Sequence, residues 1–204
     1  MKLLENIMKF KELKNYETVK ATVEREQLPK GGYICVIKNA EVKQYKGQDG
    51  SVFEKFEIAI DICDGEYKDF YANDYRNQQS EDKKWRGVLR QYLPKDDGSE
   101  KDGWTKSAFK ALIVAIEESN PNYHWDWDET KLKGLKVGCL FRLEEWEWDD
   151  KSGWSTKPFK FIDMQKIKDG KFKVPADKPL KNKSTSVDIA YEEVETLSDE
   201  DLPF

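Results

Sequence analysis

The sequence is poor in the residues on which covalent and metal chemistry depend. It contains one histidine and three cysteines among 204 residues. His124 lies in a loop rich in tryptophan and aspartate, with no serine or cysteine nucleophile near it in sequence, so a structural role is favoured over a catalytic one. Cys35, Cys63 and Cys139 form no CxxC motif and each lies in an apolar run, so we expect reduced thiols in the core.

Long apolar segments and phosphate-binding loops are also lacking. No stretch approaches the roughly 20 apolar residues of a membrane-spanning helix. Leu3 and Leu4 are followed at once by Glu5, so we expect no secretory signal. Gly31 and Gly32 follow a proline and open a predicted strand, unlike the glycine-rich loops that cradle phosphates. These absences predict a cytoplasmic protein without membrane association.

Acidic clusters provide the main sequence argument for an enzyme. Asp126, Asp128 and Glu129 offer oxygen ligands for a divalent cation. Asp61 with residues 66–68 faintly resembles a nuclease carboxylate–lysine motif, but the spacing across a two-residue turn is too tight. We therefore predict that the protein is not an enzyme and uses no metal or other cofactor.

The net charge of −5 is unevenly distributed along the chain. Residues 184–204 contain seven acidic residues and no lysine or arginine, which leaves 35 basic and 33 acidic residues in 1–183, a net charge of +2. The acidity is thus a property of the C-terminal segment. Because that segment is rich in serine, threonine and acids and has no apolar period, we expect it to be disordered.

The hydrophobic pattern of the first half predicts three strands. Residues 33–45 are rich in valine, isoleucine and tyrosine, and a polar turn follows at 46–50. The next strand alternates, which places Phe56, Ile58, Ile60 and Ile62 on one face. Asp64-Gly65 is typical of a two-residue hairpin turn, so we expect residues 66–71 to return as a third strand.

Two helices are predicted next, followed by a hairpin. The first helix is indicated by Trp85, Val88, Leu89 and Tyr92, with Ser80 as its cap and Pro94 after its end. The second is indicated by Phe109, Leu112, Ile113 and Ile116, with Thr105 as cap and Asn120-Pro121 as stop. Strands are expected at 137–148 and 154–164, around a turn at 149–153.

This order predicts a mainly β protein with a helical insertion, namely a five-stranded OB-fold barrel. We expect an N-terminal arm or helix at 1–27, the barrel at 28–165 with its insertion at about 80–120, a lysine-rich linker at 166–183 and the disordered acidic tail at 184–204.

Lysines and large rings are concentrated around the two loops with which OB-folds commonly hold oligonucleotides. The chain has seven tryptophans, nine tyrosines and ten phenylalanines, more large rings than a thin core needs. Lysines follow phosphates and flat rings stack on unpaired bases. The simpler alternative is that these rings fill the barrel. The predicted contacts to single-stranded DNA are Lys43, Tyr45, Lys46, Phe53, Lys55, Lys68, Phe70, Tyr71, Trp148, Lys151, Trp154 and Lys157.

The chain ends in acids that run directly into an apolar tripeptide. Such a tip suits a partner pocket, because the ring fills an apolar hole, a cation holds the terminal carboxylate and the acids steer the encounter. The alternative is a random solvated tail. The predicted partner-binding residues are Asp199, Glu200, Asp201, Leu202, Pro203 and Phe204.

The ending resembles that of bacterial single-stranded DNA-binding proteins, whose acidic tails finish in Asp-(Ile/Leu)-Pro-Phe. The body, over residues 25–180, resembles the phage-type single-strand binders of Gram-positive phages and integrated elements, through LPKGGY at 28–33, EDKKWRG at 81–87 and YHWDWD at 123–128. The resemblance implies an OB-fold, sequence-tolerant binding and partners in replication or recombination. It assigns no DNA contacts residue by residue.

A second hypothesis is a protein-interaction adaptor or partner-loading factor whose barrel binds protein. The near-neutral charge of residues 1–183 supports it. A homo-oligomer is compatible with either hypothesis.

Overall fold

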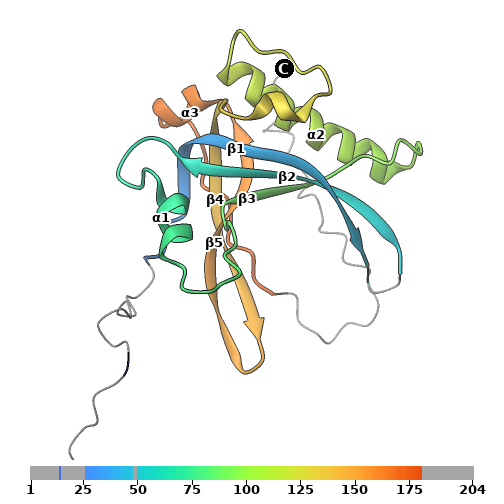
Figure 1. The fold of residues 1–204 in the computed structure, drawn as a ribbon. Coiled ribbons are helices and arrows are strands. Elements are labelled where there is room, and N and C mark those ends of the chain that lie inside the picture. The colour runs from blue at the N-terminus through green and yellow to red at the C-terminus, as the bar shows by residue number, and fades with distance from the viewer. Residues whose placement is uncertain (1–13, 15–25, 48–49, 181–204) are drawn as a thin grey trace, which may run out of the picture.

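The computed structural model describes residue 14, residues 26–47 and residues 50–180 (Figure 1). Most of the expected N-terminal arm lies outside the described residues. The same holds for the acidic tail and its tip, Asp199 to Phe204, and for the last residues of the expected linker.

The protein is mainly β, as predicted, and its strands form one antiparallel sheet. The five strands follow the order β3-β2-β1-β4-β5. In Figure 1, β1 and β2 run across the molecule while the β4–β5 hairpin runs roughly crosswise below them. The strands are β1 (Gly31–Lys46), β2 (Val52–Ile62), β3 (Val88–Tyr92), β4 (Lys136–Trp148) and β5 (Lys151–Ile162).

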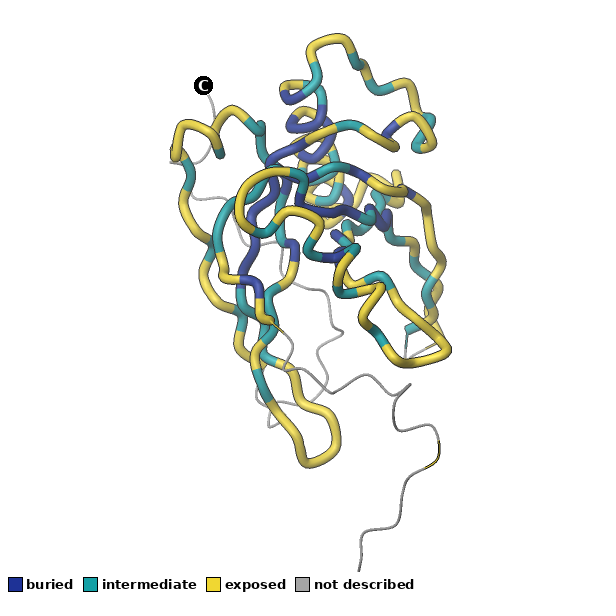
Figure 2. Tube along the Cα trace, turned by 60° about the vertical axis from the view of Figure 1, so that its left-hand side comes forward, coloured by how far each residue is buried: buried dark blue, intermediate teal, exposed yellow. Residues whose placement is uncertain are grey.

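The core lies between one face of this sheet and helix α2 (Glu100–Ser119). The predicted alternation of β2 is confirmed, because Phe56, Ile58, Ile60 and Ile62 are all buried. Phe56 meets Phe109 of α2 at 6.0 Å between ring centroids. The three cysteines are free, and Cys35 and Cys139 are buried while Cys63 is partly exposed. Figure 2 shows the buried positions gathered where strands and helix meet, with the hairpin ends exposed.

The prediction of a third strand at residues 66–71 is wrong, because this segment forms a turn and the start of a helix. Asp69 adopts a left-handed conformation (φ 60°) and donates its backbone N–H to Ile62 at 2.8 Å, and helix α1 (Phe70–Asn77) follows. The buried carboxylate of Asp61 accepts the backbone N–H groups of Tyr71 at 2.9 Å and Ala72 at 3.2 Å. Because the first N–H groups of a helix have no partner within it, this carboxylate favours a helix here.

The first predicted helix is also wrong, because residues 88–92 form β3. This strand pairs with residues 55–59 of β2. Leu89 faces the core and is 4% exposed, whereas Arg90 is exposed on the other face. The Trp85 indole N–H donates to the Ile60 carbonyl at 3.0 Å and fixes the approach to this strand.

The second predicted helix is confirmed as α2, but it begins earlier. Ser99 caps it by accepting the Asp102 N–H at 3.2 Å. Thr105 is therefore not the cap, and its hydroxyl donates to the Asp102 carbonyl at 3.0 Å. The helix ends at Ser119, next to the predicted stop at Asn120. A short 3-10 helix, η2 (Glu129–Leu132), leads into β4.

The described part of the expected lysine-rich linker packs against the sheet. Helix α3 (Met164–Lys168) spans the expected boundary between the barrel and the linker. We call residues 177–180 the strap. Lys178 donates its N–H to Leu143 and accepts that of Glu145, both at 2.9 Å, and the Leu180 N–H donates to the Glu145 carboxylate at 2.9 Å. An ion pair of 2.8 Å joins Asp177 to Lys30. The strap thus pairs with the part of β4 that lies beyond its pairing with β1.

Candidate nucleic-acid interface

Three aromatic rings gather on the face of the sheet that points away from α2. Tyr45 and Phe53 are cross-strand partners whose rings stack at 5.8 Å with 13° between their planes. Phe53 lies 5.7 Å from the ring of Tyr92 on β3. We call Tyr45, Phe53 and Tyr92 the aromatic trio. All three are half-buried, so part of each ring faces solvent.

Lys55 covers the aromatic trio. Its ammonium lies 4.3 Å from the centroid of Tyr92 and 5.7 Å from those of Tyr45 and Phe53. A cation over an aromatic face is held by about 0.5–1 kcal/mol at an exposed site. A base that stacks on these rings can therefore displace the ammonium at small cost, and the ammonium is then free to contact a phosphate.

A buried carboxylate connects the strands beside the aromatic trio. Glu57 is 5% exposed. It accepts hydrogen bonds from the Tyr45 hydroxyl and, at 2.6 Å, from Arg90, and its other oxygen lies 3.1 Å from the Lys43 ammonium. Burial alone raises the pKa of Glu57, but the bonds from Tyr45, Arg90 and Lys43 outweigh it and lower the pKa to about 2. Glu57 is therefore ionised at neutral pH.

Next to this carboxylate the same face is hollowed. The hollow has a volume of about 480 Å³ and combines four cations, two carboxylates and an indole. Its lining residues are Lys38, Asn39, Glu41, Lys43, Glu57, Ala59, Lys84, Trp85, Val88 and Arg90. The hollow is therefore a shallow surface feature in which cations and carboxylates alternate around one indole.

The structure brings together four residues predicted from the first loop, namely Lys43, Tyr45, Phe53 and Lys55. Lys46 is exposed at the end of β1. The sequence analysis missed Arg90 and Tyr92, because it assigned their segment to a helix. The apolar residues of this segment do not alternate with polar ones, so the local pattern carries no strand signal from which these two residues could have been predicted.

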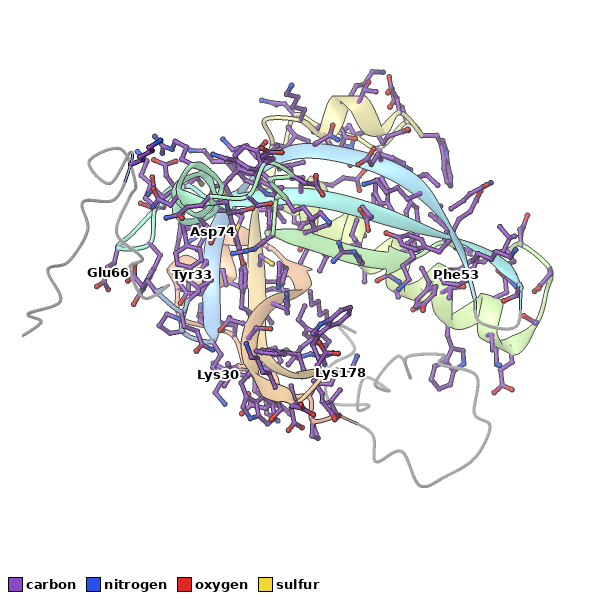
Figure 3. The ribbon with its side chains drawn as sticks, turned by 60° about the horizontal axis from the view of Figure 1, so that its bottom comes forward. Lys30, Tyr33, Phe53, Glu66, Asp74 and Lys178 are labelled. Carbon is purple, nitrogen blue, oxygen red and sulfur yellow. The ribbon has the colours of Figure 1, made fainter. Side chains whose placement is uncertain are left out.

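Lys68, Phe70 and Tyr71 were predicted as DNA contacts, with Lys68 and Phe70 on this face. The placement of Lys68 and Phe70 is wrong, because the third strand does not form at 66–71. Tyr71 is 3% exposed, and Phe70 packs on it edge-on at 5.2 Å. Lys68 is exposed in the turn before α1. Figure 3 shows Glu66 and Asp74, which bracket this segment, at the far end of the β1–β2 pair from Phe53.

The β4–β5 hairpin carries the second predicted group of residues. Trp148 lies opposite Lys151, and Trp146 lies opposite Gly153. A side chain at 153 would meet the Trp146 ring at 3.0 Å, so the glycine allows this indole to lie across β5. Lys157 is the partner of Arg142, which lies six residues before Trp148 on β4. Because this separation is even, Lys157 shares the face of Trp148.

The register places Trp148 and Trp154 on opposite faces. Val36 pairs with both Asp61 and Lys136. Asp61 shares the face of Phe53, and Lys136 shares that of Trp148, because residues an even number apart along a strand point the same way. Trp148 therefore lies on the face of the aromatic trio, whereas Trp154, opposite Glu145, lies on the other.

We expect Trp148→Ala to weaken binding of single-stranded DNA by about 1–3 kcal/mol, the contribution of one stacking platform. Trp148 is 74% exposed, so its removal leaves the core intact. Trp154→Ala is expected to leave binding nearly unchanged, because the Trp154 ring lies on the other face of the sheet. Fluorescence titration with poly-dT measures both, with thermal unfolding as the check of folding. Equal losses in the two variants would contradict this assignment of faces.

A further aromatic cluster lies on the α2 side of the sheet. Trp127 stacks on Phe109 at 6.4 Å with 17° between the planes, and it is 79% exposed in a left-handed conformation (φ 68°). The nearby acidic side chains of Asp126 and Asp128 both form ion pairs with Lys131. Over residues 26–47 and 50–180, no group of three or more histidine, cysteine or acidic side chains is arranged to hold a metal ion.

No protein-family model matches the chain, and the comparison with curated proteins gives no match either. None of the helices that the structure describes has the length and hydropathy needed to span a membrane.

Proposed function

We propose that the protein binds single-stranded DNA with little dependence on sequence. The observation that carries this proposal is the aromatic trio with Lys55 above it, on a sheet face that α2 leaves uncovered. Stacking is sequence-tolerant because every base has a flat face, and each stacked base contributes about 1–3 kcal/mol. A duplex keeps its bases stacked inside, so it presents no free face to these rings.

The proposal includes an OB-type barrel. It is supported by the sheet order β3-β2-β1-β4-β5 and by contact between the two edge strands, β3 and β5. The position of α2 between β3 and β4 in the chain also agrees with this fold. In such a barrel the β1–β2 turn and the β4–β5 hairpin border the ligand face. Tyr45 and Phe53 flank the first of these turns, and Trp148 lies at the second.

We place the activity in phage or mobile-element DNA replication or recombination, on the resemblance of the body and of the C-terminal ending. The acidic tail then recruits partner proteins through Asp199 to Phe204. Leu180, the last described residue, is bonded to Glu145 on β4, so the described part of the chain ends beside the β4–β5 hairpin. The seven acids of residues 184–204 have the same sign of charge as phosphates, so they can compete with phosphates for basic side chains.

The test of this function is titration with poly-dT, followed by intrinsic tryptophan fluorescence. We expect quenching with poly-dT, much weaker binding of a duplex and an affinity that falls with salt. Each phosphate that is neutralised adds about −0.7 to the log–log salt slope for single strands. Equal affinity for duplex and single strands would contradict the proposed function.

The exposed Trp127 favours a second candidate, a barrel that binds protein. Its ring lies on the α2 side, away from the aromatic trio, and forms a cluster with Phe109 and Trp125. A contiguous exposed apolar patch is typical of a protein-binding surface. Under this adaptor function, poly-dT leaves the fluorescence unchanged.

A further inference from the structure

The candidate DNA-binding face contains a carboxylate where a phosphate-binding surface should avoid one. The Glu57 side chain is 6% exposed, whereas those of its partners Lys43 and Arg90 are 46% and 50% exposed. The two cations can therefore be reached from solvent, but the carboxylate that holds them cannot. Glu41 lies 2.9 Å from the Lys43 ammonium and adds a second negative charge at the edge of the hollow.

This arrangement affects phosphates and bases differently. A phosphate that approaches Lys43 or Arg90 has to compete with a carboxylate already bound at hydrogen-bonding distance, and it is repelled by the charge of Glu57. A neutral base experiences no such repulsion. The Tyr45 hydroxyl also donates to Glu57, which fixes one ring of the aromatic trio in its stacking position.

We infer that Glu57 is a specificity-determining residue that makes this face select unpaired bases over the phosphates of duplex DNA. The inference rests on the proposed function and deepens it. Duplex DNA offers mainly its phosphates to a flat face, so an internal counterion for Lys43 and Arg90 reduces its binding. The affinity for single-stranded DNA is reduced less than the affinity for duplex, because the bases of a single strand stack on the rings and the carboxylate does not oppose this stacking.

The experiment replaces Glu57 by glutamine, which keeps the shape of the side chain and removes its charge. The affinity of E57Q for a mixed-sequence duplex is expected to rise, on the order of tenfold at 0.1 M salt for each cation that gains a phosphate. The salt slope with poly-dT should steepen by about 0.7 for each such contact. The ratio of single-strand to duplex affinity should fall.

Two matched variants control for charge and for folding. Glu54→Gln makes the same charge change on the same strand, but Glu54 lies on the opposite face, bonded to Gln44 at 3.1 Å, so the affinity ratio should not change. Glu41→Gln releases Lys43 from an exposed carboxylate (48%), so it does not endanger the fold. It should shift the ratio in the direction of E57Q, by a smaller factor.

The outcomes separate this inference from the proposed function. If the unaltered protein does not bind poly-dT, the proposed function itself is wrong. If it prefers single strands but E57Q and E54Q give the same ratio, only the role of Glu57 is overturned. A loss of poly-dT affinity in E57Q without any gain for duplex would mean that Glu57 is purely structural. If E57Q does not fold, the test rests on E41Q. An unchanged ratio of single-strand to duplex affinity in E41Q would then overturn the inference.

Discussion

Replacing Phe53 and Tyr92 together by alanine is expected to weaken binding to poly-dT by a factor of about 30 or more. Each ring is a stacking platform of about 1–3 kcal/mol, and 1.4 kcal/mol corresponds to a tenfold change in affinity. The two rings lie 5.7 Å apart and share the Lys55 ammonium, so their loss removes the platform that carries the proposed function. Tyr45 is left in place because its hydroxyl also binds Glu57, which would mix two effects.

The matched control for this pair is Trp127→Ala. Trp127 is the most exposed of the large apolar side chains among the described residues, and it lies on the α2 side of the sheet. Its removal should leave poly-dT binding nearly unchanged, because the Trp127 ring is on the side of the sheet opposite to the aromatic trio. Circular dichroism and thermal unfolding establish that each variant is folded. A folded double variant that binds poly-dT within threefold of the unaltered protein would show that DNA does not stack on these rings.

Deleting Leu202, Pro203 and Phe204 is expected to abolish binding to a replication or repair partner while poly-dT affinity stays nearly unchanged. The deletion removes a ring worth about 1.5–3 kcal/mol if fully enclosed, together with the position of the terminal carboxylate. For a micromolar partner, with a binding free energy near −8 kcal/mol, losing both contacts makes binding undetectable. A pull-down from host lysate with intact and truncated protein measures the loss.

Deletion of the whole segment 184–204 is the companion to this truncation. It also removes the seven acids, so the remaining chain has a charge of +2 and should bind DNA modestly more tightly at low salt. The short deletion keeps those acids, so no such gain is expected from it. Identical partner lists for the intact and shortened proteins would identify the tip as a solvated end.

The elements predicted correctly from sequence are those whose pattern is locally unambiguous. β2 alternates over four buried positions, and α2 repeats its apolar residues at helical spacing over several turns. The segment at 85–92 is short, and its apolar residues are spaced as in a helix. It becomes β3 because it pairs with the free edge of β2, a long-range effect that local spacing does not contain.

The prediction of a strand after Asp64-Gly65 was wrong for a related reason. The turn signal is real, but Asp61 accepts the first N–H groups of α1 from ten residues away. Both wrong elements also affected the prediction of the candidate site. The residues of β1 and β2 were placed together, whereas Arg90 and Tyr92 were missed and Phe70 and Tyr71 were misplaced. The opposite faces of Trp148 and Trp154 follow from the register, which sequence alone did not provide.

The strap bears on where the chain can be shortened safely. β1 pairs with β4 only as far as Phe141, and beyond that point the backbone of Leu143 and Glu145 is paired with Lys178. A protein that ends at Leu180 keeps these bonds and loses only the segment that follows. One that ends before Asp177 leaves a length of β4 with unpaired backbone groups, a template on which another chain can add a strand. Self-association of the shorter protein would then reflect an uncovered strand edge, and it would be a mistake to ascribe it to the missing acidic residues.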